Sequence, residues 1–241
     1  LVKHAAKQAE AWGATDAILL PLYPQFSSTT TASSLAAWRR ASKLPCATVC
    51  CYPAGAGFAQ THADAILKAW GDAGSPANPR VLFSAHGLPQ SVIDRGDPYQ
   101  WQVEQSVAAV RRLLPATWQT RICYQSRVGP MKWLAPSTEQ EIHAAGQDRV
   151  GVIVSPVAFV SEHVETLVEL DIEYRRLAER VNLPFYLRAA APGAAPRFID
   201  TLAALAEQAL AAPGKVQSET GGRLCPQQWG LCAQHHPGGA R

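Results

Sequence analysis

The stretch RVGVIVSPVAFV, residues 149–160, is an almost continuous apolar run, and the acidic segment SEHVETLVELDIEY, residues 161–174, follows it directly. A short run that is apolar at nearly every position indicates a strand buried on both faces, as in a parallel sheet covered by helices on either side. The segment that follows has apolar and acidic residues on opposite sides of a helix. This junction therefore predicts an α/β fold in which a charged helix begins at the carboxyl end of a core strand.

The same alternation continues on both sides of this junction. The predicted strands are Ala17–Leu22, Ala47–Tyr52, Arg80–Ala85, Thr120–Tyr124, Arg149–Ser155 and Pro184–Leu187. The predicted helices are Phe58–Gly71, Tyr99–Leu114, Thr138–Ala145, Val164–Val181 and Arg197–Ala211. Strands that alternate with helices in this way predict a doubly wound parallel sheet. From Gly214 onward the chain has little periodicity, which predicts loop, or a segment ordered by something other than a core.

Composition and charge exclude several classes of protein. The chain has 241 residues, 47% of them hydrophobic, which suits one large domain or two small ones. A net charge of +3 with 17% charged residues is too mild a bias for nucleic-acid binding. No apolar run reaches the roughly 18 residues of a membrane span, and the N-terminus lacks the layout of a signal peptide. Six cysteines in a chain this long are not a secreted disulfide scaffold, so we expect a reducing cytoplasm.

Polar residues follow the predicted strands at the edge where open α/β sheets bind ligands. His86 follows a strand in the motif SAHGLP, where Gly87 allows close approach of the backbone. A neutral imidazole can bind a metal or accept a proton near neutral pH. The plain alternative is a histidine that is only hydrogen-bonded within its loop. Together with Glu165 after a neighbouring strand, His86 offers a base and a metal ligand.

Four carboxylates of the acidic segment fall on one side of an ideal helix, within an arc of about 80° at about 100° per residue. They belong to Glu162, Glu165, Glu169 and Glu173. The plain alternative is a solvated acidic face near a helix N-terminus. Solvated faces usually include Lys or Arg at i+4, however, and the first basic residue here is Arg175. We therefore predict a row of carboxylates that leads a divalent cation or protons to the site, with a π-bulge early in the helix.

Four longer motifs make the sequence recognisable: LYPQFSSTTTASSL, VLFSAHGLPQSVIDRGDPY, YQSRVGPMKWLAPSTEQEI and PVAFVSEHVETLVELDIEY. Together they resemble ferrochelatases, the lyases that insert Fe²⁺ into a porphyrin at the end of haem biosynthesis. The resemblance implies two Rossmann-like, chelatase-type domains with a porphyrin cleft between them, and protoporphyrin IX and ferrous iron as substrates. It also implies a cytoplasmic protein with peripheral contact to a membrane and no nucleic acid partner. The alternatives are a cobalt chelatase acting on a related tetrapyrrole, and a porphyrin- or haem-binding fragment without catalysis.

The resemblance also assigns roles to individual residues. His86 and Glu165 would form the catalytic pair, binding the metal and accepting the pyrrole protons. The porphyrin pocket would be lined by Tyr23, Met131, Trp133 and Phe159. A polar path for metal or protons would run through Glu162, His163, Glu169 and Asp171. Aromatic and sulfur side chains can instead be core, but GPMKWLAP is rich in Gly and Pro, which favours a binding loop.

The resemblance divides the chain into three parts. Residues 1–40 would be the remnant of an N-terminal chelatase domain, and residues 41–190 the second domain with the active-site histidine and acidic helix. Residues 191–241 would be a helix that packs back on the first domain, followed by a cysteine-containing tail. Ferrochelatases normally have many more residues before the position of Leu1, and the chain lacks a starting Met. We therefore expect residues 1–241 alone to have a partly open site, to self-associate and to show little chelatase activity.

Many ferrochelatases hold a [2Fe–2S] cluster through one upstream cysteine and three in the C-terminal tail. On that pattern Cys51, Cys225 and Cys232 would be ligands, with His235 and His236 close in sequence. The tight triplet of tail cysteines is absent here. The alternative is an apolar strand, VCCYP, and two loop cysteines without a metal.

Overall fold

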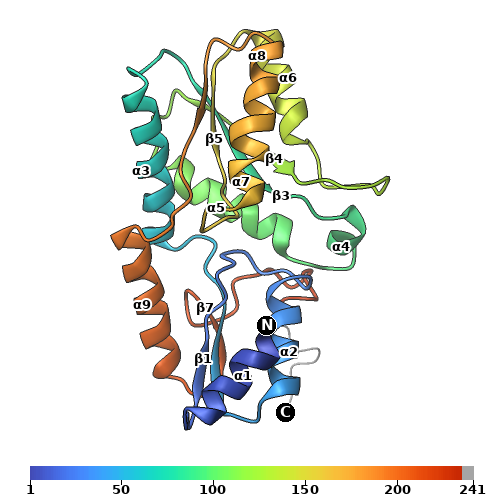
Figure 1. Cartoon of the computed structure of the whole chain (residues 1–241), viewed down its shortest axis with the longest axis vertical. Helices are drawn as coiled ribbons and strands as arrows, with labels where there is room; N and C mark the ends of the chain where they lie inside the picture. Colours follow the sequence, from blue (N-terminus) through green and yellow to red (C-terminus); the bar gives the residue numbers. More distant parts are fainter. Residues whose placement is uncertain (235–241) are drawn as a thin grey trace.

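The computed structural model describes residues 1–234 and contains two sheets, one in each half of the molecule (Figure 1). The first sheet has the strand order β1-β2-β7 and the second β4-β3-β5-β6. Every pairing in both sheets is parallel. The α/β fold with doubly wound parallel sheets is therefore confirmed. Among the described residues, no helix has both the length and the apolar character needed to cross a membrane.

Every predicted strand and helix has a counterpart, with ends shifted by a few residues. The strands are β1 Ala17–Leu19, β2 Cys46–Cys51, β3 Arg80–His86, β4 Gln119–Gln125, β5 Val152–Ser155, β6 Tyr186–Arg188 and β7 Val216–Ser218. The α-helices are α1 Val2–Ala11, α2 Thr31–Ala41, α3 Ala56–Asp72, α4 Gln90–Asp94, α5 Tyr99–Arg111, α6 Thr138–Asp148, α7 Val164–Leu167, α8 Arg175–Arg180 and α9 Pro196–Leu210. The short elements α4 and β7 and the polar helices α1 and α2 were not among the predicted elements, because their apolar periodicity is weak.

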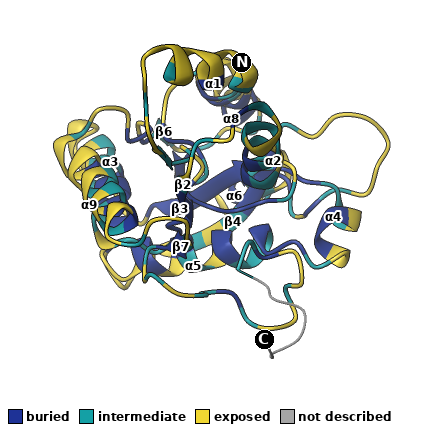
Figure 2. Ribbon diagram, turned by 90° about the horizontal axis from the view of Figure 1, so that it is seen from below, coloured by how far each residue is buried: buried dark blue, intermediate teal, exposed yellow. Residues whose placement is uncertain are grey.

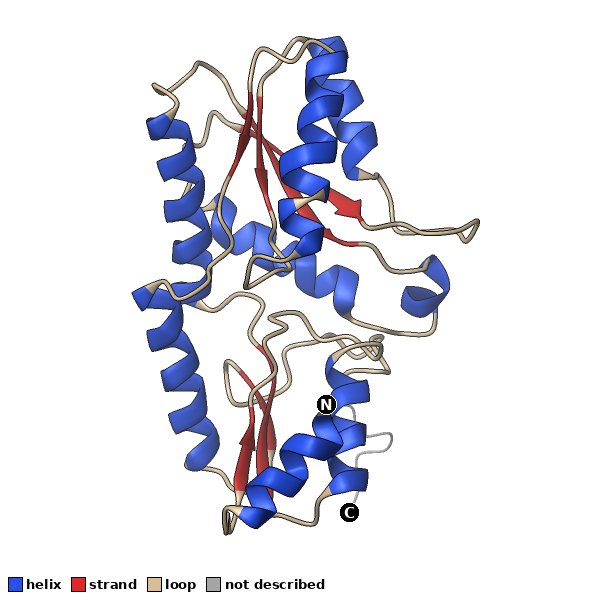
Figure 3. Cartoon of the chain, viewed as in Figure 1, coloured by secondary structure: helices blue, strands red, loops and turns tan. Residues whose placement is uncertain are grey.

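The second sheet is covered by helices on both faces, as Figure 3 shows. Val81, Phe83 and Ala85 of β3 pack with the buried side chains of α3 and α5. Leu82, which points the opposite way, packs with α6, α8 and the π-helix between α7 and α8. Both faces of the strand are thus buried, which explains why its sequence is apolar at nearly every position. Figure 2 shows these strands as the buried interior of the molecule.

The first sheet takes strands from distant parts of the chain. β2 pairs with β1 and with β7, so the predicted boundary at residue 40 does not separate the two sheets. The predicted division placed β2 in the second domain, whereas its two parallel partners are β1, which precedes it, and β7, near the C-terminus. Helix α9 packs on this sheet through Phe198, Leu205 and Ala209. The tail segment β7 is ordered by pairing with β2, although its own sequence shows no strand pattern.

The predicted helix Val164–Val181 is interrupted by a π-helix. The turn α7 is followed by a π-helix over Glu169–Tyr174 and then by α8. The N–H of Glu173 reaches the carbonyl of Val168, an i→i+5 bond. The predicted π-bulge in this helix is therefore confirmed. It begins at Glu169, after the first helical turn. Such bulges are frequent at functional sites.

The core beside β5 contains a buried histidine that affects stability. His62 of α3 is fully buried, its Nε2 has no hydrogen-bond partner among residues 1–234, and its Nδ1 lies 3.4 Å from Ser155 Oγ. Burial lowers the pKa of His62 to about 4. The unfolded chain therefore binds a proton at this residue below about pH 6.5, whereas the folded chain does not. Stability is lost as the pH falls from about 6.5 to about 4.

We expect His62→Leu to weaken this pH dependence. Between pH 7.5 and pH 5, the wild type should lose about 2 kcal/mol of unfolding free energy through His62, and the variant should lose that much less. Urea unfolding at both pH values measures the difference. His143→Leu is the matched control, because His143 is exposed on α6. Equal pH dependence in the wild type and His62→Leu would contradict the assignment.

Candidate functional site

The predicted pair of His86 and Glu165 is formed. His86 is the last residue of β3, and Glu165 lies in α7, after the loop that follows β5. Because β3 and β5 are neighbours in the sheet, both side chains lie at the same carboxyl edge. His86 Nδ1 is 3.4 Å from Glu165 Oε2, and the two side chains are 40% and 35% exposed. The prediction that these side chains face each other is confirmed.

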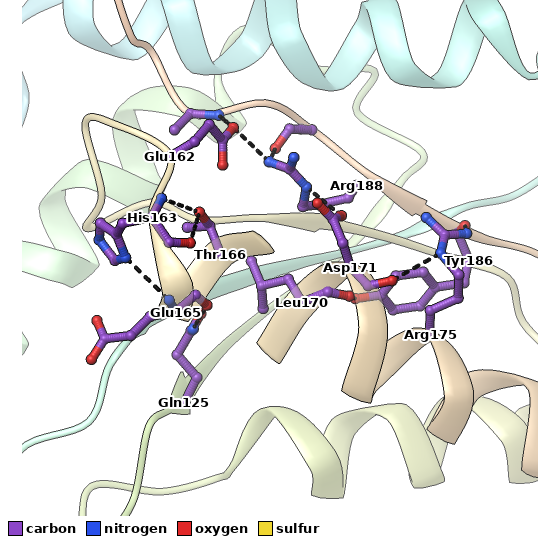
Figure 4. Close-up of polar contacts among 12 residues, drawn as sticks. Gln125, Glu162, His163, Glu165, Thr166, Leu170, Asp171, Arg175, Tyr186 and Arg188 are labelled. Atoms are coloured by element: carbon purple, nitrogen blue, oxygen red, sulfur yellow. Dashed lines mark hydrogen bonds and ion pairs between the residues drawn. The ribbon is translucent and has the colours of Figure 1, made fainter. Parts of the chain in front are cut away.

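His163 fixes the direction in which α7 begins. Its Nδ1 accepts a hydrogen bond from the N–H of Glu165 at 3.2 Å, and its own N–H donates to Thr166 Oγ1 at 2.9 Å (Figure 4). Because Nδ1 is an acceptor here, the neutral ring carries its proton on Nε2. The ring of Phe159 lies edge-on to both His86 and His163, with centroids 6.3 Å and 5.1 Å apart. These contacts hold the backbone at the start of α7, which carries Glu165.

A cavity of about 280 Å³ lies beside this pair, with walls from both halves of the molecule. The second half contributes His86, Leu88, Tyr99, Ala158, Phe159, His163 and Glu165. The loop after β1 contributes Tyr23, Gln25, Ser27, Thr29 and Thr30. Two of the predicted pocket residues, Tyr23 and Phe159, thus lie in one cavity with the predicted pair. A concave site with aromatic walls and a few converging polar groups is typical of small-molecule binding.

The buried carboxylate of Asp97 ties the two walls of this cavity together. Its Oδ2 accepts hydrogen bonds from Ser27 Oγ at 3.0 Å and from the N–H and Oγ of Ser28 at 2.6 Å each. Its Oδ1 accepts from the N–H of Tyr99 at 2.9 Å. The hydroxyl of Tyr99 donates to the carbonyl of His86 at 2.9 Å. The loop after β1, the start of α5 and the end of β3 therefore share one network.

The predicted single row of carboxylates is wrong. Glu162 precedes α7 and accepts hydrogen bonds from Arg188 Nη1 at 2.7 Å and the N–H of Ala191 at 2.8 Å. Arg188 Nε donates to Asp171 Oδ1 at 2.6 Å, so the guanidinium lies between the two acids (Figure 4). Burial would raise the pKa of Glu162, but the bonds from Arg188 and Ala191 outweigh it and hold the pKa below its usual range. The prediction assumed one regular helix from Glu162, whereas the helix starts later and contains a π-helix.

Glu169 lines a second, polar hollow of about 450 Å³ at the end of β4. Its carboxylate accepts hydrogen bonds from Gln125 Nε2 at 3.0 Å and from the hydroxyl of Tyr174 at 2.7 Å. The N–H and Oγ of Ser126 donate to it at 2.7 Å and 2.6 Å. Because four donors surround it, this carboxylate anchors the π-helix to β4 rather than facing the cavity.

Met131 and Trp133, the other two predicted pocket residues, line this second hollow. They lie on the loop between β4 and α6, which extends away from the body of the molecule (Figure 3). A Cβ on Gly87 would lie 3.6 Å from Trp133 Cε3 and 2.7 Å from the carbonyl oxygen of Gln125. Glycine at this position therefore lets the loop approach the residue after His86. Trp133 thus lies close to the residue that follows His86, although it does not line the cavity beside His86 and Glu165.

Four cysteines gather in two pairs near the end of β2. Cys50 Sγ and Cys51 Sγ are 3.6 Å apart, and Cys225 Sγ accepts a hydrogen bond from Gln102 Nε2 at 3.2 Å. A hydrogen bond from Cys225 lowers the pKa of Cys232 to about 6, and the same bond raises the pKa of Cys225. All of the cysteines are free thiols.

These cysteines do not form a ready metal site. Within residues 1–234, no group of three or more His, Cys, Asp or Glu side chains is arranged to hold a metal ion. The predicted cluster ligands Cys51, Cys225 and Cys232 are therefore near one another without forming a preorganised set. His235 and His236 lie outside the described residues.

Sequence reasoning missed several residues that organise the site. Arg188 and Gln125 each end a strand, β6 and β4, and the rule that selected His86 after its strand would also have found them. Asp97 and Tyr99 carry no comparable signal, because their importance comes from burial between two segments distant in sequence.

Comparison with known proteins gives a family and its relatives. The family model described as Ferrochelatase matches residues 1–210. The ferrochelatase of Phenylobacterium zucineum is 53% identical over 242 residues, covering 100% of this chain and 70% of the relative. The ferrochelatase of Hyphomonas neptunium is 49% identical over 232 residues, covering 96% of this chain and 65% of the relative. The chain thus spans about two thirds of the length of the curated relatives that it matches.

Among solved structures, SirB from Bacillus subtilis with Fe³⁺ is similar, with a TM-score of 0.57 and 14% identity. The match covers 87% of this chain and 79% of that chain. The sirohydrochlorin chelatase SirB in complex with cobalt, from a subspecies of the same organism, gives a TM-score of 0.55 and 13% identity over 87% and 77% of the two chains. At such low identity the likeness shows the fold alone, and that fold agrees with the one predicted.

Proposed function

Because this chain belongs to the ferrochelatase family, we propose that it carries the catalytic pair of an enzyme that inserts Fe²⁺ into a porphyrin, with protoporphyrin IX as the substrate. The observation that carries the proposal is the contact of 3.4 Å between His86 Nδ1 and Glu165 Oε2 beside a cavity with walls from both sheets. Metal insertion releases two N–H protons from the macrocycle and admits a dication. A site for it needs a proton acceptor and an anionic ligand, and an imidazole with a carboxylate supplies both.

The two side chains divide the work in the proposed reaction. When Nδ1 of His86 holds its proton toward Glu165, Nε2 carries the lone pair that accepts a pyrrole proton. The carboxylate of Glu165 then stabilises the imidazolium that forms and attracts the incoming Fe²⁺. Both side chains are partly exposed, so the two protons released from the porphyrin pass to solvent.

The surrounding side chains are proposed to hold the macrocycle. Tyr23 and Phe159 would contact its faces from the cavity, and Met131 and Trp133 would complete the pocket from the loop between β4 and α6. A rigid apolar pocket that fits a bent ring better than a flat one lowers the barrier to insertion. Of the predicted path residues, we propose only His163 for proton or metal transfer.

A [2Fe–2S] cluster on Cys51, Cys225 and Cys232 stays a prediction. The two close thiol pairs support it, and the lack of a preformed set of three ligands within residues 1–234 counts against it.

We also propose a cytoplasmic setting with peripheral contact to a membrane. The free thiols fit a reducing compartment. Leu22, Tyr23 and Met131 are large apolar side chains near the site that are about half exposed, and they support contact with a membrane surface. For the domain division, we propose that a smaller first unit is built on β1, β2, β7 and α9 and a second on the remaining sheet.

Metal preference is the direct test of this function. We expect the chain to bind protoporphyrin IX, measured by fluorescence quenching, and to insert Fe²⁺ more slowly than the Phenylobacterium zucineum relative assayed beside it. Preference for Co²⁺ with a reduced tetrapyrrole would instead favour a cobalt chelatase. Porphyrin binding without any turnover, beside an active relative, would favour a binding fragment.

A further inference from the structure

Gln125 contacts the backbone on both sides of the proposed catalytic pair. It is the last residue of β4, is 1% exposed and is aligned with His86 in the parallel register of β3 and β4. Its carbonyl oxygen accepts a hydrogen bond from the N–H of Gly87 at 2.8 Å, directly after His86. Its side-chain Nε2 donates to the carbonyl oxygen of Glu165 at 2.7 Å. One buried residue thus links the strand that carries the base to the turn that carries the carboxylate.

The orientation of the Gln125 side chain is determined by its partners. Its Oε1 accepts a hydrogen bond from Ser84 Oγ at 2.8 Å, and its Nε2 also donates to Glu169 Oε2 at 3.0 Å. With the amide reversed, an oxygen would face the carbonyl of Glu165 and the carboxylate of Glu169, which are both acceptors. The side chain is therefore a rigid brace that cannot rotate without losing its hydrogen bonds.

The turn that carries Glu165 needs such a brace. The helix α7 has only 4 residues, and a helix this short is not stable through its own hydrogen bonds. We infer that Gln125 is a positioning residue that sets the separation of the His86 and Glu165 side chains for metal insertion. The inference rests on the proposed function of that pair. A misplacement of about 1 Å can cost about 10²-fold in rate.

The test compares Gln125→Glu with Ser84→Ala. Gln125→Glu keeps the size of the side chain and the acceptor for Ser84, but it turns the donor toward Glu165 and Glu169 into an acceptor. We expect kcat for Fe²⁺ insertion to fall about 10- to 100-fold, with KM for porphyrin changed less than about threefold. Ser84→Ala is the matched control, because it removes a buried hydrogen bond to Gln125 and leaves both donated bonds in place. Its kcat should stay within about threefold of the wild type.

A second readout does not depend on turnover. In protein labelled with ¹⁵N at histidine, the ring signals of His86, assigned through His86→Gln, report its contact with Glu165. They should move in Gln125→Glu and stay in place in Ser84→Ala, with the signals of buried His62 unchanged in both. Gln125→Met keeps the volume without an added charge and should show the same change if Gln125→Glu does not fold.

The results of these experiments distinguish a failure of this inference from a failure of the proposed function. Normal kcat and unmoved His86 signals in a folded Gln125 variant would show that Gln125 has only a structural role. If the wild type inserts no metal, the proposed function is wrong. If the His86 signals still move in the Gln125 variants, the positioning role of Gln125 remains supported. Equal loss of kcat in Ser84→Ala and Gln125→Glu would also overturn the inference, because the effect would then follow stability.

Discussion

In a complete relative that carries these residues, replacing His86 by alanine is expected to abolish Fe²⁺ insertion while the fold stays intact. Removal of a positioned base typically costs about 10²–10⁴ in rate, and this variant also loses a ligand for the incoming cation. The His86 side chain is 40% exposed, so little packing is lost with it. The initial rate of haem formation measures the effect, and circular dichroism checks the fold.

Two further variants make this experiment decisive. Glu165→Gln keeps the shape of the side chain and removes its charge, so it should lower kcat far more than the affinity for free porphyrin. His143→Ala is the control for loss of a histidine, because His143 is exposed on α6 away from the cavity. Near-normal turnover in both His86→Ala and Glu165→Gln would show that the acid–base assignment is wrong.

Asp97→Ala is expected to have the largest effect on stability. Asp97 is fully buried and accepts four hydrogen bonds from Ser27, Ser28 and Tyr99. Alanine leaves these donors buried without an acceptor, and each unsatisfied group costs about 1–3 kcal/mol. We expect a loss of about 3–5 kcal/mol in the free energy of unfolding, measured by urea titration. Porphyrin affinity should also fall, because the two walls of the cavity are no longer tied together.

The control for this variant is Asp94→Ala on the neighbouring helix α4. Asp94 is exposed, and within the described part of the chain its side chain accepts only from Gln90 Nε2 at 3.0 Å, so its loss should cost less than about 0.5 kcal/mol. If Asp97→Ala lost less than about 1 kcal/mol, water would be replacing the carboxylate, and the proposed tie between the walls would be wrong.

From the sequence alone, the site could be located only where the functional residues follow strands that are neighbours in the sheet. His86 and Glu165 follow strands that are neighbours in the sheet, so the rule about carboxyl ends brings them together. The row of acids failed because it relied on a single regular helix through Glu162. The start of α7 after His163 and the π-helix are set by local hydrogen bonds, which helical periodicity does not encode.

The fold class could be read from the apolar pattern alone, because a strand buried on both faces must be apolar at nearly every position, as in β3 and β5. The sequence also indicated the His86–Glu165 pair, through motifs that resemble one family. Packing between distant segments places β2 and β7 in one sheet, pairs Arg188 with Glu162, and sets Asp97 and Gln125 beside the site. These contacts join residues far apart in the chain, and a polar residue buried by a distant segment has the same local sequence as one exposed to solvent.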